Sequence, residues 1–310
     1  MRRAVLFLLA TLLSPSVHAQ ESLSTDDEYS RSELFSIARN AVPGVDWFAL
    51  PSTFAFPDDA RATSTFGIDH SHHNDDNCGC TFDWDKVAKQ KVQFVIHKAT
   101  QGVSYTDPTL AKNAAAILAL KQIDSGAYHF LTASGDTGAQ AANYLAATRD
   151  FTFALPPTLD LEWDPGAMRD DCPTDAIIVI RRANGSVLRK CDKWGFVSSK
   201  DIIDKANAWI DAVATATGRT PILYTNANWF NQRIGAGNIA KIHTTLIWTA
   251  DYSRNGLATE APKVAGGIDW TLWQFTDGAK LNVGNQSVLI DANIFEGSID
   301  ELRGALDEAN

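Results

Sequence analysis

Short apolar segments alternate with stretches of helical spacing over most of the chain, and this alternation limits the fold more than any other feature. It begins at Thr65 and includes eight apolar segments, each expected to be a strand. The segments are TFGIDHSH, KVQFVIHKAT, IDSGAYHFLT, LPPTLDLEW, PILYTN, TLIWTADY, DWTLWQFTD and SVLIDANIF. Strands separated by helices favour an α/β fold, a TIM-like barrel of parallel strands whose last crossovers are irregular. An open doubly wound sheet is the main alternative, but no GxGxxG loop follows a strand and no phosphate-binding lysine loop is present.

The same pattern divides the chain into parts. Residues 1–19 have the features of a signal peptide, because two arginines precede the apolar run AVLFLLATLL and a small-residue cleavage site follows. Residues 20–64 form an N-terminal extension, most simply a strap on the main domain and otherwise a partner-binding or pro-segment. Residues 65–310 form the barrel domain, in which residues 164–197 are a long insertion after strand 4. We therefore expect an exported protein, either periplasmic or secreted.

Polar residues mark where several of the expected helices begin. Asp107 precedes Pro108, which favours the first turn of a helix, so Asp107 is expected to be the N-cap. Asp136 is expected to begin the next helix, and Ser198 or Ser199 a longer one after the insertion.

The charge balance restricts the partners. The formal net charge is −10, and removal of the signal peptide with Arg2 and Arg3 makes it −12. An acidic chain is a poor partner for nucleic acid or for an anionic membrane surface. We expect a monomer with no cofactor and no membrane insertion.

The four cysteines fit an oxidising compartment, in which disulfides form. They are Cys78, Cys80, Cys172 and Cys191, and three complete pairings are open. The most economical pairing joins Cys172 to Cys191 and closes a local loop. A bridge within the CGC tripeptide would be strained, so cross-pairing remains an alternative.

The most informative polar residues are the carboxylates Asp160 and Glu162 in LPPTLDLEW. In an extended strand they share one face with Cα atoms about 7 Å apart, near the spacing at which two carboxyl groups cleave a glycosidic bond. Asp69, Asp251 and Asp291 also lie at expected strand ends, where the functional groups of a parallel barrel gather. They are accompanied by Tyr128, His129, Tyr224, Trp248, Tyr252, Trp273 and Gln274. Carboxylates among aromatic rings are typical of a carbohydrate site, although each residue alone is more often a cap or a core residue.

The chain from Phe66 to Phe295 resembles the glycoside hydrolase family 25 lysozymes, which are N-acetylmuramidases. The resemblance rests on GIDHSH, HKATQGVSYTDPTLAKN, GAYHF, LDLEW, PILYTN, LIWTADY, LWQFTD and IDANIF, which occur in the family's order. It implies a (β/α)5(β)3 barrel. It also implies a peptidoglycan hydrolase that cleaves the β-1,4 bond between N-acetylmuramic acid and N-acetylglucosamine with retention of configuration.

The resemblance also assigns roles to individual residues. Glu162 matches the catalytic acid and Asp160 its partner carboxylate, whereas Asp69 and Asp291 match the two other acidic positions of the site. Tyr128 matches a tyrosine near the reacting sugar. With the residue types above, the expected substrate-binding set is Tyr128, Tyr224, Trp248, Tyr252 and Trp273. Asp251 falls at a position that the family does not fix, so we expect it at the surface or the rim.

Two departures from the family bear on the substrate. The first strand is followed by HSHHNDDNCGC, and the family's TEG is replaced by Thr100-Gln101-Gly102, which lacks the carboxylate. His70, His72, His73, Asp75 and Asp76 include metal-ligand types, but their spacing matches no compact zinc motif, so we expect no metal. We expect both this loop and the 164–197 insertion to border the glycan groove and to affect the substrate preference.

The expected mechanism uses Glu162 as general acid and base. Because Asp160 lies on the acid's side of the bond, it is expected to orient the substrate's own acetamido group, which attacks the anomeric carbon; direct attack by a carboxylate is the alternative. A hydrolase of another N-acetylated glycan such as chitin, or a non-catalytic wall-binding protein, are the other functions that fit this sequence.

Overall fold

The structure is a computed structural model that describes residues 54–56, 64–181, 186–254, 256–257 and 259–308. The expected signal peptide and most of the N-terminal extension lie outside these residues. Among the helices described, none combines the length and the apolar character needed to cross a membrane.

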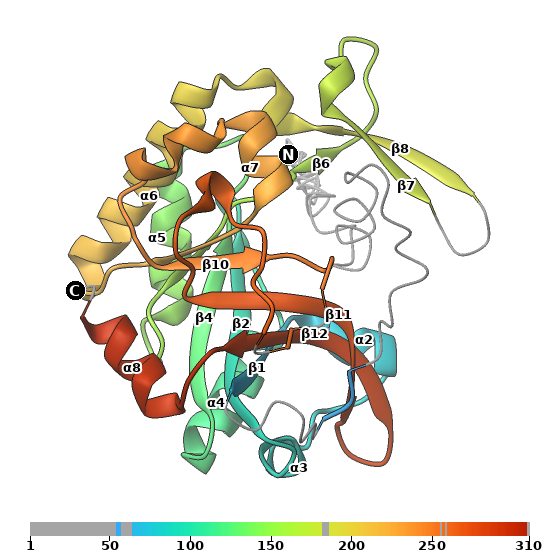
Figure 1. The fold of residues 1–310 in the computed structure, drawn as a ribbon, viewed down its shortest axis with the longest axis vertical. Coiled ribbons are helices and arrows are strands. Elements are labelled where there is room, and N and C mark those ends of the chain that lie inside the picture. Colours follow the sequence, from blue (N-terminus) through green and yellow to red (C-terminus); the bar gives the residue numbers. More distant parts are fainter. Residues whose placement is uncertain (1–53, 57–63, 182–185, 255, 258, 309–310) are drawn as a thin grey trace, which may run out of the picture.

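Eight strands form a closed barrel (Figure 1). Their order is β1-β12-β11-β10-β9-β5-β4-β2, and the pairing of β1 with β2 closes the ring. β12 is antiparallel to both its neighbours, whereas the other pairs in the ring are parallel. The strands are β1 Thr65–His70, β2 Val92–Gln101, β4 Asp124–Phe130, β5 Thr158–Asp160, β9 Ile222–Asn226, β10 Ile247–Ala250, β11 Leu272–Asn282 and β12 Ser287–Phe295. Each falls within one of the eight expected segments or, for β2 and β11, extends beyond its end, and the predicted α/β barrel is confirmed. A two-residue strand, β3 Tyr105–Thr106, adds to the edge of β2.

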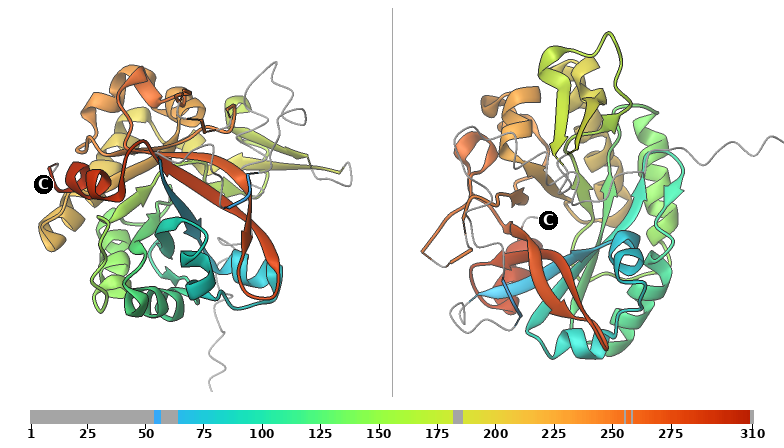
Figure 2. Two further views of the ribbon diagram at one scale, coloured as in Figure 1. Left: turned by 60° about the horizontal axis from the view of Figure 1, so that its bottom comes forward. Right: turned by 90° about the vertical axis from the view of Figure 1, so that its right-hand side faces the viewer.

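Helices cover the outside of the barrel and link its first strands (Figures 1 and 2). The helices are α2 His72–Cys78, α3 Trp84–Ala88, α4 Leu110–Leu120, α5 Thr137–Thr148, α6 Ser199–Thr217, α7 Ala227–Arg233 and α8 Ile299–Asp307. From β9 onward the helical elements are short: α7 and the 3₁₀ turn η5 Ala236–Lys241 link β9 to β10, and the 3₁₀ turn η6 Ala265–Gly267 lies between β10 and β11. β11 and β12 form a hairpin.

The helix caps follow the expected chemistry with one exception. The Asp136 side chain accepts a hydrogen bond from the Ala139 amide, and Ser198 does the same for Asp201. The expected cap at Asp107 is wrong, because α4 begins at Leu110 and its N-cap is Thr109. The Asp107 carboxylate instead accepts hydrogen bonds from the amide and the hydroxyl of Thr109.

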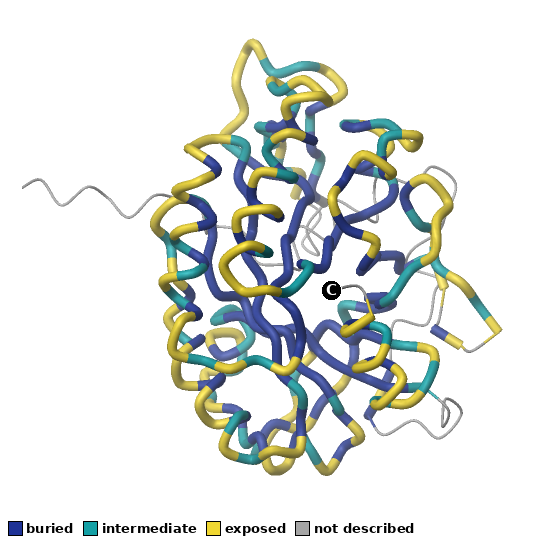
Figure 3. Tube along the Cα trace, turned by 90° about the vertical axis from the view of Figure 1, so that its left-hand side faces the viewer, coloured by how far each residue is buried: buried dark blue, intermediate teal, exposed yellow. Residues whose placement is uncertain are grey.

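The hydrophobic core has two parts. Most buried residues lie on the barrel strands, and the outer helices also have exposed residues (Figure 3). The first part includes Trp209 of α6, which is buried and makes an edge-to-face ring contact with Tyr144 of α5. The second lies around β1, β11 and β12 and includes Phe54, whose ring stacks on Phe66 at 5.2 Å. Burial of a ring such as Phe54 contributes about 2 kcal/mol, so residues 54–56 of the N-terminal extension are part of the folded domain.

The chain after β5 forms a separate small sheet. Its strands are β6 Pro165–Gly166, β7 Ile177–Arg181 and β8 Val187–Asp192, in the antiparallel order β6-β8-β7, with η3 Thr174–Ala176 and η4 Lys193–Phe196 beside them. The β7–β8 ribbon extends away from the barrel (Figures 1 and 2). Because this sheet starts five residues after the last residue of β5, it rises from the carboxyl end of that strand.

Both disulfides are local. Cys172 is bonded to Cys191, as expected, with their Cα atoms 5.9 Å apart. Cys78 is bonded to Cys80, so the alternative of cross-pairing is wrong. Gly79 between them has φ of 56°, a left-handed conformation that is readily available to glycine and that turns the chain back at the end of α2.

Candidate active site

Three of the four acidic residues lie on strands of the barrel, and the fourth, Glu162, follows the end of one. Asp69 of β1 is directly opposite Asp291 of β12 in an antiparallel ladder, so the two side chains are on the same face of the sheet. Asp160 is the last residue of β5, in register with Phe130 and Tyr224. All four acidic side chains are buried, including Glu162 at 3% exposure.

Glu162 lies outside the strand, contrary to the expectation that it shares an extended strand with Asp160. β5 ends at Asp160, and Glu162 follows at a bend. The ladder ends here because the chain turns outward to start the small sheet. The last contacts of the strand are Leu131 N–H to the Asp160 carbonyl at 2.9 Å and Leu161 N–H to the Tyr224 carbonyl at 3.0 Å.

A network of hydrogen bonds holds the Asp69 carboxylate. The Gln274 Nε2 donates to Asp69 Oδ2 at 2.6 Å, and the Gln274 Oε1 accepts from the hydroxyls of Tyr224 at 2.7 Å and Tyr252 at 2.5 Å. The fixed amide therefore connects two phenols to one carboxylate. All four side chains are buried, and they come from β1, β9, β11 and the loop after β10.

Asn293 gives Asp69 a second amide partner. Its Nδ2 donates to the same Oδ2 at 3.0 Å, and its Oδ1 accepts from the indole N–H of Trp248 at 2.8 Å. Trp248 thus positions a residue that contacts Asp69. Sequence reasoning missed Asn293, although it lies in the IDANIF segment two residues after Asp291. Alternation along β12 places both on the same face, which is the signal that could have found it.

The phenol of Tyr252 is buried in an acidic environment. Burial raises the pKa of Tyr252 well above its usual value, and the phenol of Tyr224 and the acidic groups of Asp291, Asp277 and Glu162 raise it further. The same phenol donates a hydrogen bond to Gln274, which in turn bonds Asp69. Asp277 is an additional acidic residue that was not singled out, although it closes the LWQFTD segment.

Tyr128 lies on the strand next to Asp160. It is in register with Thr158, two residues before Asp160, and its side chain is buried. Its contact with a substrate sugar stays a prediction.

Two expected site residues point to the other face of the sheet. Trp273 precedes Gln274, and because Gln274 faces Asp69, the adjacent Trp273 faces outward. There it packs against Trp270 and Phe275 in the second part of the core, so its expected place in the substrate-binding set is wrong. His129 likewise stacks on Trp209 of α6, and its burial lowers its pKa to about 3.

Asp251 is buried rather than at the surface or the rim. Its carboxylate accepts hydrogen bonds from the backbone amides of Ser253 at 3.0 Å and Lys263 at 2.7 Å. It therefore shapes the loop after β10, in which Tyr252 lies.

Two histidines at and after the end of β1 lie close to acidic side chains. His72 Nδ1 lies 2.9 Å from Asp107 Oδ2, and His70 Nε2 lies 3.6 Å from Asp75 Oδ1. Within the part of the chain that the structure describes, no three histidine, cysteine or acidic side chains converge as a metal site would require.

The barrel, the buried acidic residues of its strands and the amide–phenol network agree with the family that the sequence matches. The model of glycosyl hydrolases family 25 matches residues 68–283, well over half of the chain. The chain belongs to glycosyl hydrolases family 25. It is therefore a glycoside hydrolase, and the resemblance that its motifs indicated is confirmed. The match includes Asp69, Asp160 and Glu162 and ends before Asp291.

Individual relatives are similar over most of the chain. The N,O-diacetylmuramidase of Chalaropsis sp is 29% identical over 218 residues, which cover 68% of this chain and 86% of that protein. Lysozyme M1 of Streptomyces globisporus is 28% identical over 250 residues, 78% of this chain and 71% of that protein. The crystal structure of the lysozyme from Streptomyces coelicolor has the same fold, with a TM-score of 0.58 and 23% identity over 80% of this chain and 99% of that one.

Proposed function

We propose that this family 25 glycoside hydrolase cleaves peptidoglycan at the β-1,4 bond between N-acetylmuramic acid and N-acetylglucosamine, with retention of configuration. The observation that carries the proposal is the set of four buried acidic side chains of one barrel, in which Asp69 faces Asp291 across two strands and is bonded through Gln274 to the phenols of Tyr224 and Tyr252. The substrate is supported by the relatives above, one named a muramidase and one a lysozyme.

In the proposed mechanism Glu162 is the general acid and base. Its proton passes to the glycosidic oxygen as the bond to the anomeric carbon breaks, and the carboxylate later takes a proton from the water that completes hydrolysis. Glu162 lies past the end of β5, at a bend and away from the ladder, where a side chain can approach a leaving group.

Asp160 has the orienting role. It would accept the N–H of the substrate's acetamido group, whose carbonyl oxygen attacks the anomeric carbon and is released when water attacks. Asp69 and Asp291 would stabilise the positive charge that develops on the sugar ring. Tyr128, Tyr224, Trp248 and Tyr252 complete the proposed site, with Trp248 acting through Asn293 and Tyr224 through Gln274.

The proposed setting is outside the cytoplasm, with the chain exported by residues 1–19 and acting as a monomer. Two disulfides support an oxidising compartment. The 164–197 segment, which holds the small sheet, would border the glycan groove and affect substrate preference.

The test is the substitution Glu162→Gln, which keeps the size of the side chain and removes the acid. We expect release of reducing ends from purified peptidoglycan to fall by about 10²–10⁴-fold, the usual contribution of a general acid. Glu308→Gln, an exposed change at the end of α8, is the matched control and should leave the rate unaltered. Mass spectrometry of the wild-type products should show N-acetylmuramic acid at the new reducing ends. Near-normal turnover by Glu162→Gln would refute the assignment.

The attacking group is tested separately. A fluorinated sugar that traps covalent glycosyl–enzymes should leave the protein unlabelled if the acetamido group attacks. Labelling of Asp160 or Asp69 would show that a carboxylate attacks instead.

A further inference from the structure

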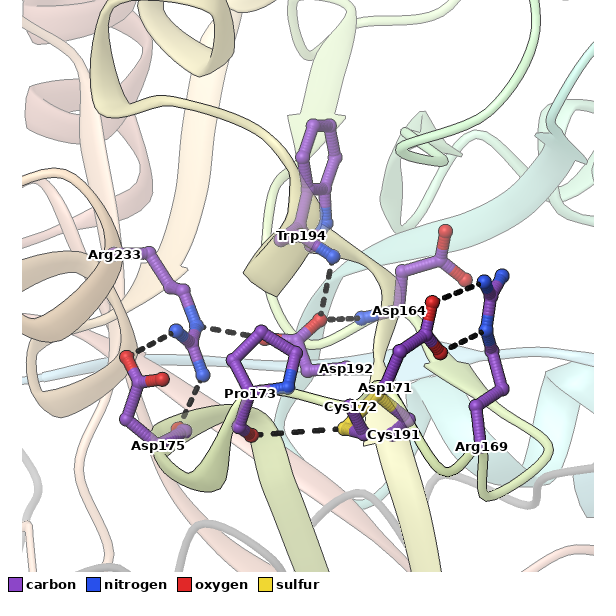
Figure 4. Close-up of a disulfide and its surroundings, with 10 residues drawn as sticks. All are labelled: Asp164, Arg169, Asp171, Cys172, Pro173, Asp175, Cys191, Asp192, Trp194 and Arg233. Carbon is purple, nitrogen blue, oxygen red and sulfur yellow. Dashed lines mark hydrogen bonds and ion pairs between the residues drawn. A yellow bond between two sulfur atoms is a disulfide. The ribbon is translucent and has the colours of Figure 1, made fainter.

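Asp192, the last residue of β8, is buried in the small sheet and accepts hydrogen bonds on both oxygens (Figure 4). Oδ1 accepts from the backbone amides of Asp164 at 3.1 Å and Trp194 at 3.2 Å. Oδ2 accepts from the indole N–H of Trp229 at 3.1 Å and from Nε of Arg233 at 3.1 Å. One buried carboxylate thus joins the chain after β5 to helix α7.

Asp164 lies two residues after Glu162, and its amide, its carbonyl and its carboxylate each have a bonding partner. Its amide donates to Asp192, and its carbonyl accepts from the Lys193 amide at 2.9 Å. Its carboxylate accepts from the Ala133 amide at 2.9 Å and lies 3.3 Å from the Lys193 ammonium. The chain is therefore held on both sides of Glu162, by the last strand contacts at Asp160 and Leu161 and by this set of bonds at Asp164.

Arg233 and a disulfide keep Asp192 in place. The Arg233 guanidinium is almost fully buried and bonds both Asp192 and Asp175, at 2.8 Å from Nη1 to the Asp175 carboxylate. Cys191, the residue before Asp192, is bonded to Cys172 (Figure 4). Asp192 is thus fixed by an ion pair on one side and by a covalent link in the backbone next to it.

We propose that Asp192 is a positioning residue for the catalytic acid, which it orients through the backbone of Asp164. The proposal rests on the proposed function, in which Glu162 is that acid. It makes the small sheet part of the catalytic apparatus. No strand ladder holds the backbone at Glu162, and the hydrogen bond from Asp164 to Asp192 of the small sheet fixes it instead. A displacement of about 1 Å at the acid costs roughly 100-fold in rate, so the loss of this anchor has a measurable effect.

The test is Asp192→Asn, which keeps the shape of the side chain. An amide has one acceptor oxygen, so its NH₂ group faces two N–H donors, whichever way it is turned. We expect kcat on a soluble peptidoglycan tetrasaccharide to fall at least about tenfold, with KM changed less than about twofold. Asp175→Asn is the matched control, because Asp175 bonds the same Arg233 and its side chain is 62% exposed. We expect it to change kcat by less than about twofold.

A structural role is separated from a positioning role by combining substitutions. If Asp192 acts through Glu162, Asp192→Asn causes no further loss of kcat in a Glu162→Gln background, because the group that it positions has gone. An equal further loss in that background, or an unchanged kcat in the single variant, would overturn the proposal. Near-normal turnover by Glu162→Gln would instead overturn the proposed function.

Arg233→Lys is the second variant, for use if Asp192→Asn does not fold. A lysine keeps the charge but cannot bond Asp192 and Asp175 with the same planar geometry. We expect a smaller fall in kcat, about threefold or more, with KM again changed less than about twofold. A rise in KM at constant kcat would overturn the proposal.

Discussion

Gln274 supports three other buried side chains, and its replacement by methionine has a predictable cost. The substitution Gln274→Met keeps a chain of similar length and removes the amide. One hydrogen bond to a charged carboxylate contributes about 2 kcal/mol and each bond to a phenol about 1 kcal/mol. With Asp69, Tyr224 and Tyr252 all buried, we expect the free energy of unfolding to fall by about 4 kcal/mol.

The measurement is guanidinium unfolding at pH 7 with linear extrapolation, in which the midpoint shifts and the slope stays constant. Tyr224→Phe and Tyr252→Phe are the companion variants, since each removes one bond to the amide oxygen and should cost about 1 kcal/mol. Gln274→Met should therefore lower the free energy of unfolding by more than the two phenylalanine variants together. The difference should equal the contribution of the hydrogen bond to Asp69, about 2 kcal/mol. A loss no larger than that of one phenol would refute the reasoning that Gln274 holds the Asp69 carboxylate.

Three further predictions concern the rest of the chain. Replacing Cys172 and Cys191 by serine opens a loop with a sequence separation of 19 and should lower the free energy of unfolding by about 3 kcal/mol; an unchanged denaturation midpoint would contradict this. Burial lowers the pKa of His97 and of His129 to about 3, so NMR should show both imidazoles neutral from pH 8 to pH 5, and protonation of either within that range would contradict the burial. Burial alone would raise the pKa of Asp107, but the hydrogen bonds that it accepts lower it below its usual range, so Asp107 adds stability above about pH 4 that is lost in stronger acid. Asp107→Asn should accordingly be destabilising at pH 7 and cost clearly less at pH 2 in thermal unfolding; an equal cost at both values would exclude this origin.

The sequence predicts the barrel well because its signals are local. Apolar runs bounded by turn residues mark the strands, and the helix starts at Asp136 and Ser198 have the caps that their side chains predict. The carboxylates of the site are also recognisable, because they lie at or near the ends of these runs. Such features depend on residues that are a few positions apart.

What the sequence could not give is which face of each strand points into the barrel. Strands that are buried on both faces read as continuous apolar runs, so no alternation separates inside from outside. Trp273 and Gln274 are neighbours, and only the register of β11 with β10 and β12 puts Gln274 against Asp69, 205 positions away. The error at Trp273 has this origin.

The position of Glu162 shows the same limit in another form. A pattern with two carboxylates two residues apart suggests a shared strand face, but β5 stops at Asp160, and the acid lies on a bend between two anchored points. A bend has no ladder to keep it rigid, so its rigidity has to come from bonds made by distant residues. Here those bonds come from the segment that interrupts the barrel, through Asp192 to Asp164. The insertion that the sequence marks as a departure from the barrel pattern therefore stabilises the segment on which the proposed chemistry depends.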